Sequence, residues 1–200
     1  MSEQQRPQRR IPILSTIVVI AAALTMVGLG IWQIGRKDEK EAMIVRYEAA
    51  IQSDNKRPFP ADGGGAFSDA DLFHPTAFEC TSVLGREAIA GRSERGRAGF
   101  AQIVRCQTGR GPADVKLGWS DRPEYPDYEG GVVEGLIAPG GPDGARVQAI
   151  PPLAGLQPLA RPDPGDLPNN HLAYAGQWFF FALTALVIYW LALRRKWRGA

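Results

Sequence analysis

Histidine, cysteine and methionine are scarce in this 200-residue chain, which contains two, two and three of them respectively. A copper or zinc site needs three or four clustered ligands, and the nearest set, His74 with Cys80 and Cys106, does not predict one. There is no C-x-x-C redox pair and no G-x-S-x-G nucleophile motif. These absences argue against a copper carrier or an external enzyme, so we do not expect the protein to be a catalyst.

Charge is missing from two long stretches, residues 11–34 and 172–193. About 20 apolar residues are enough to cross a bilayer core of roughly 30 Å, so each stretch predicts a transmembrane helix. The alternative for the first stretch is a cleaved signal peptide ending in its alanine run. Cleavage there would leave the apolar residues 24–34 behind, and signal sequences have shorter apolar regions. We therefore expect the first stretch to be retained.

The charged residues predict the orientation. The tails, residues 1–10 and 194–200, together carry a net charge of +6, whereas residues 35–171 carry −4. Short basic segments stay on the cytoplasmic side of a membrane. We expect a protein of the bacterial inner membrane with both termini cytoplasmic and the central segment periplasmic. Because that segment is acidic overall, its one arginine-rich turn at 92–97 predicts a solvated loop and no nucleic-acid binding.

The central segment predicts a small, mostly antiparallel β domain, so the fold class is membrane α plus external α+β. Apolar residues at helical spacing predict that the first helix continues outward through residues 37–52. Ser68 is expected to cap a short helical turn. Alternation and glycine-rich turns predict strands at Ala77–Leu84, Phe100–Gln107, Asp114–Trp119, Gly131–Ile137 and Arg146–Ile150. The proline-rich residues 151–168 predict an extended tether back to the membrane.

Both cysteines, Cys80 and Cys106, fall in this central segment. An oxidising compartment would permit a disulfide between them. The alternative is two free thiols packed as small apolar side chains, and the sequence does not decide between the two.

Aromatic and polar residues gather where both spans meet the outer surface. His171, Tyr174, Ala175 and Trp178 have the spacing of one helical face, as do Gly28, Trp32 and Gly35. Arg36 follows one turn later, at the expected lipid headgroup level. Imidazole can ligate haem iron, and arginine suits haem propionates. The alternative is that these residues are ordinary interfacial anchors.

Two motifs at these positions resemble the Surf1 family. Gly30–Arg36 reads G-I-W-Q-I-G-R, similar to the family's G-x-W-Q-x-x-R, and Asn170–Trp178 reads N-H-L-A-Y-A-G-Q-W, similar to N-H-x-x-Y-A-x-x-W. The resemblance implies a membrane-anchored assembly factor for haem–copper cytochrome c oxidase. Such a protein would accept haem a from haem a synthase and help place it in oxidase subunit I.

The resemblance also implies a set of haem-contacting residues. His171 would be the ligand of the haem iron, Tyr174 and Trp178 would line the haem plane, and Trp32, Gln33 and Arg36 would form the opposing wall. A competing hypothesis is a haem-free scaffold, in which the same residues pack against helices of assembly intermediates in the lipid bilayer.

Overall fold

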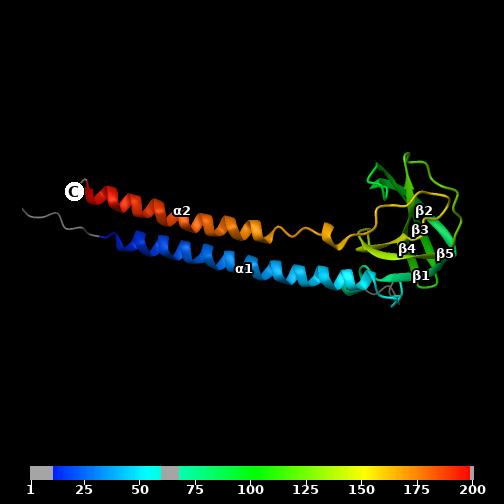
Figure 1. Cartoon of the computed structure of the whole chain (residues 1–200), viewed down its shortest axis with the longest axis horizontal. Helices are drawn as coiled ribbons and strands as arrows, with labels where there is room; N and C mark the ends of the chain where they lie inside the picture. The colour runs from blue at the N-terminus through cyan, green and yellow to red at the C-terminus, as the bar shows by residue number, and fades with distance from the viewer. Residues whose placement is uncertain (1–10, 60–67, 199–200) are drawn as a thin grey trace, which may run out of the picture. The chain divides into compact units, whose positions relative to one another are not determined.

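The computed structural model describes residues 11–59 and 68–198 (Figure 1). The chain divides into two compact units, one made of Met1–Ala42 with Pro168–Ala200 and the other of Met43–Leu167. Two long apolar helices near the chain ends flank a six-stranded, mostly antiparallel sheet. The expected fold class is therefore confirmed.

The two long helices are α1, Ile13–Ile51, and α2, His171–Arg198. Each is long and apolar enough to cross a membrane. The helix expected to continue outward does so, because α1 runs without a break to Ile51. The basic tail expected from residue 194 begins inside α2, whose last turns carry the arginines and the lysine; the tail at 1–10 lies outside the described residues.

Small and half-buried residues recur along one stripe of each helix, with spacings of four and three. They are Thr16, Val19, Ala23, Met26, Gly30 and Gln33 on α1, and His171, Ala175, Trp178, Ala182, Ala185 and Tyr189 on α2. This average spacing of 3.5 residues is the repeat that keeps two helices in contact along a left-handed seam. The alanines at its centre are almost fully buried, with Ala175 1% and Ala182 3% exposed. We call this stripe pair the helix seam.

The second unit is a curled six-stranded sheet with the order β1-β5-β6-β4-β3-β2. Its strands are β1 Pro75–Cys80, β2 Ser82–Arg92, β3 Ala98–Thr108, β4 Gly111–Ser120, β5 Gly131–Pro139 and β6 Ala145–Ala149. All neighbouring pairs are antiparallel except β4 with β6. The first and last strands of this order are consecutive in the chain, separated by Thr81 alone, so the sheet curls back on itself.

A backbone hydrogen bond and a disulfide join the junction of β1 and β2 at Thr81 to β3. The backbone N–H of Thr81 donates to the carbonyl oxygen of Gln107 on β3 at 2.9 Å, while Cys80 beside it forms a disulfide with Cys106. The curled sheet encloses an apolar core of valine, leucine and isoleucine side chains. The last turns of α1 add Tyr47 to this core, with its ring centroid 4.8 Å from that of Phe73. A 3-10 turn, η2 at Asp69–Asp71, follows the Ser68 cap as expected.

The strand prediction at Ala77–Leu84 was wrong in one respect. The structure breaks that segment at Thr81 into the end of β1 and the start of β2. The arginine-rich turn predicted at 92–97 is shorter in the structure, because β2 extends to Arg92 and β3 begins at Ala98. Glycines and charged residues weaken the apolar alternation of β2, and ten residue pairs with β3 hold it in the sheet instead.

The tether expected at 151–168 is not a free linker. Gln157 pairs with Trp119 on β4 through two backbone hydrogen bonds, of 2.7 and 3.1 Å, and Leu159 bridges to Ser93. Leu159 is 7% exposed and packs on Trp119. Gly118 permits this contact, since a Cβ there would lie 2.5 Å from Cβ of Leu156. The segment then turns through η3, Pro164–Asp166, towards α2.

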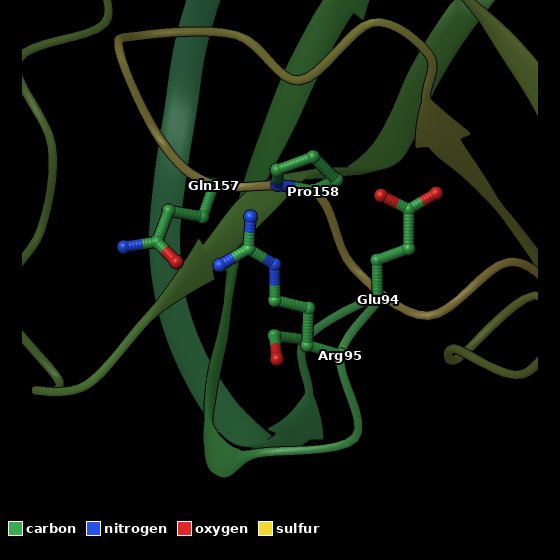
Figure 2. Close-up of a pocket in the computed structure, with 5 residues that line it drawn as sticks. Glu94, Arg95, Gln157 and Pro158 are labelled. Atoms are coloured by element: carbon green, nitrogen blue, oxygen red, sulfur yellow. The ribbon is translucent and has the colours of Figure 1, made fainter.

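Where this segment meets the β2–β3 hairpin it leaves an open pocket of about 370 Å³ (Figure 2). Ser93, Glu94 and Arg95 of the hairpin line one side, and Gln157 and Pro158 line the other. Figure 2 shows the guanidinium of Arg95 reaching towards Gln157 and Pro158, while Glu94 points elsewhere. The hairpin itself is held by Arg97, whose guanidinium lies 4.5 Å from the ring centroid of Trp119.

Candidate functional site

At one end of the helix seam a single hydrogen bond joins the two motifs. Nδ1 of His171 lies 2.8 Å from Oε1 of Gln33. Because an amide oxygen can only accept, this contact makes Nδ1 the donor, and in the neutral imidazole with that tautomer the lone pair lies on Nε2. A histidine that donates one ring nitrogen to a fixed acceptor and keeps the other free has the usual arrangement of a metal-ligating histidine.

Next to this hydrogen bond, α1 and α2 pack closely against each other. A Cβ on Gly30 would lie 2.6 Å from Cε1 of Phe179, so only glycine lets the ring of Phe179 rest on α1 at this level. Ala175, one turn along α2 from His171, is 1% exposed. Small residues at such contacts let helix backbones approach closely in a membrane. The seam therefore holds Gln33 and His171 at a fixed separation.

The residues expected around the haem fall into two groups. Gln33, His171 and Trp178 lie on the helix seam and are partly buried, with the Trp178 ring edge-on to Phe181 at 6.3 Å between centroids. Trp32 and Tyr174 point outward, with exposed fractions of 56% and 50%.

The face of α1 that carries Gly28, Trp32 and Gly35 is not the one that meets α2. Gly28, Trp32 and Gly35 do share a face, but it is exposed, and a Cβ on either glycine would meet nothing within 4 Å. Contact with α2 falls instead on the stripe that contains Gly30 and Gln33. The small residues of this stripe, Thr16, Ala23 and Gly30, recur every seven residues in the sequence, and this spacing identifies the stripe.

Arg36 lies just beyond the apolar part of α1 and pairs with Glu39 on the same helix. Next to it, Lys37 donates to Glu41 at 2.8 Å, and that hydrogen bond raises the pKa of Lys37. Half of the Arg36 side chain is exposed, and ion pairs in solvent contribute little to stability. Arg36 is therefore able to exchange Glu39 for another anion at small cost.

Within the described residues 11–59 and 68–198, no group of three or more His, Cys, Asp or Glu side chains is placed to hold a metal ion. A metal that arrives already inside a porphyrin needs only an axial ligand from the protein. The Gln33–His171 pair fits that smaller requirement.

The family model of the Surf1 family matches residues 20–183 of the chain. The chain belongs to the Surf1 family. The match includes both motifs, the whole curled sheet and the Gln33–His171 pair. No curated relative matches the chain. Membership in the Surf1 family implies a role in the assembly of cytochrome oxidase, and the family is one of assembly factors with no known catalysis.

Proposed function

We propose that this Surf1 protein carries haem a and helps to insert it into subunit I of haem–copper cytochrome c oxidase. In this proposal α1 and α2 cross the bacterial inner membrane, both termini are cytoplasmic and the curled sheet is periplasmic. The opposite net charges of the tails and of residues 35–171 support that orientation.

The observation that carries the proposal is the hydrogen bond between Gln33 and His171. It links the two family motifs across two helices, and it presents Nε2 of His171 as a ligand for iron. Bound haem a would supply an iron with an open axial position. Trp32, Tyr174 and Trp178 would offer aromatic surface to the porphyrin, and Arg36 would pair with a propionate.

Transfer requires that the haem can leave. One axial histidine holds iron less firmly than two, and the exposed side chains of Trp32 and Tyr174 leave the site open on its outer side. An opening towards lipid would let the farnesyl tail of haem a stay in the bilayer. Haem a synthase is the expected donor, and oxidase subunit I the expected acceptor.

The test is the reduced-minus-oxidised absorption spectrum of the full chain, purified in detergent after coexpression with the enzymes of haem a synthesis. We expect a haem a spectrum in the wild type, its loss or shift in His171→Ala, and reduced haem content in Gln33→Leu. Removing the partner that orients a ligating histidine typically weakens metal binding by about 10- to 100-fold. His74→Ala, at the other histidine of the chain, is the matched control and should retain the spectrum.

The alternative is a haem-free scaffold for assembly intermediates. The exposed aromatic rings of Phe180, Phe181 and Trp190 on α2 offer surface for partner helices. A wild-type protein that is free of haem but copurifies with oxidase subunit I would favour this alternative and refute haem transfer.

A further inference from the structure

Two cations lie side by side on the neighbouring strands β4 and β6 of the curled sheet. Lys116 on β4 is in register with Gln148 on the parallel strand β6, and Arg146 lies two residues before Gln148. Because side chains alternate along a strand, Lys116, Arg146 and Gln148 project from the same face. The inward-facing neighbours Val115 and Val147 are fully buried in the apolar core.

Neither cation has an anionic partner among the residues that the structure describes. Arg146 is only 8% exposed, and its Nε is buried without a hydrogen bond. Burial lowers the pKa of Lys116, and the positive charge of Arg146 lowers it further. Buried charges in proteins are normally paired, because an unpaired one loses its hydration without compensation.

Two carboxylates that lie close to these cations in the sequence are already engaged. Asp114, two residues before Lys116 on β4, lies 3.4 Å from one guanidinium nitrogen of Arg105, and Asp143 lies 3.3 Å from the other. Arg105 therefore takes both of these negative charges, so the pair Lys116 and Arg146 keeps a surplus of positive charge.

The wall beside Arg146 is a glycine turn between β5 and β6. Gly140, Gly141 and Gly144 all have positive φ, a conformation that glycine adopts without strain. A Cβ on Gly141 would lie 3.2 Å from Nε of Arg146, so the bare backbone packs directly against the guanidinium.

We propose that Lys116 and Arg146 form a binding site for a phosphate group, either of free inorganic phosphate or of a phospholipid headgroup. The anion supplies the missing negative charge, with the guanidinium of Arg146 donating from its terminal nitrogens and the ammonium group of Lys116 acting as a second donor. The site is independent of haem, because all of its residues lie on the curled sheet.

The test is thermal unfolding of the full chain in detergent, titrated with inorganic phosphate against chloride at constant ionic strength. We expect phosphate to raise the unfolding temperature of the wild type, and Lys116→Met to raise the apparent Kd at least tenfold. Lys56→Met is the matched control, since Lys56 is exposed and paired with Glu134, and its Kd should match the wild type. Arg146→Lys keeps the charge but shortens the reach, and should weaken binding while the protein stays folded.

A second titration with glycerol phosphate identifies the source. Tighter binding of glycerol phosphate than of inorganic phosphate indicates a headgroup, and the reverse indicates the free ion. A wild type that responds equally to phosphate and chloride, or a Lys116→Met variant that responds like the wild type, would overturn the proposal. Neither outcome affects the haem spectrum, so the two proposals fail separately.

Discussion

The disulfide between Cys80 and Cys106 should contribute much of the stability of the curled sheet. The bridge spans 26 residues of sequence and closes the sheet where β1 passes into β2. A cross-link over a loop of this size lowers the entropy of the unfolded chain by an amount worth about 3.5 kcal/mol at 25 °C. We expect Cys80→Ala/Cys106→Ala to lower the free energy of unfolding by at least that amount, because both side chains are also buried.

The assay is pulse proteolysis of the full chain in detergent across a urea gradient, which reports the fraction of unfolded domain. The double variant loses both the cross-link and the buried sulfur atoms. The reduced wild type loses only the cross-link, so comparing the two separates these contributions to stability. We expect reduction to cost the wild type about 3.5 kcal/mol, the contribution of the cross-link alone, and to leave the double variant unchanged. If reduction changes the wild type by less than about 0.5 kcal/mol, the size of an ordinary surface substitution, this reasoning is wrong.

Three further predictions follow from contacts described above. Gly30→Leu should displace the facing aromatic ring, open the helix seam and reduce haem content, whereas Gly28→Leu, on the exposed face of α1, should not; the absorption spectrum measures both. Gly118→Ala should lift the 152–157 segment off β4 and destabilise the domain by about 1–3 kcal/mol in urea, while Gly109→Ala, with no neighbour within 4 Å, should be nearly neutral. Because the pKa of Lys116 is lowered in the fold, the unfolded chain binds more protons between that pKa and the usual 10.5, so stability should rise with pH in this window. Lys116→Met should abolish that rise, and a stability curve with the same pH dependence as the wild type would contradict the assignment.

Much of the architecture could be predicted from local patterns. Two uncharged stretches predicted the long helices, and apolar residues at helical spacing predicted that α1 continues to Ile51. The alternation of apolar residues along β4 predicts a half-buried strand. In the structure the 152–157 segment packs on Gly118, so this residue is buried as well. A pattern of period two shows alternation along a strand, but it does not show what distant segment covers the other side.

The sequence named candidate site residues but did not give their arrangement. Spacing along a single helix says which residues share a face, and so it grouped Gly28 with Trp32 correctly. It does not say which face meets the neighbouring helix, because that depends on where small residues allow contact on both helices at once. Gln33 entered only through the family resemblance, and its contact with His171 needed the pairing of α1 with α2.

The helix seam has a polar contact at each of its two ends. Near one end Oγ1 of Thr16 meets the hydroxyl of Tyr189 at 2.5 Å, and near the other Gln33 meets His171. At a rise of 1.5 Å per residue, Thr16 and Gln33 are about 25 Å apart along α1, close to the thickness of a bilayer core. A slip of one helix by a heptad would separate both polar pairs inside an apolar medium, where few other partners exist. The two contacts thus fix how far α2 is shifted along the axis of α1. They also fix the position of the imidazole of His171 along that axis.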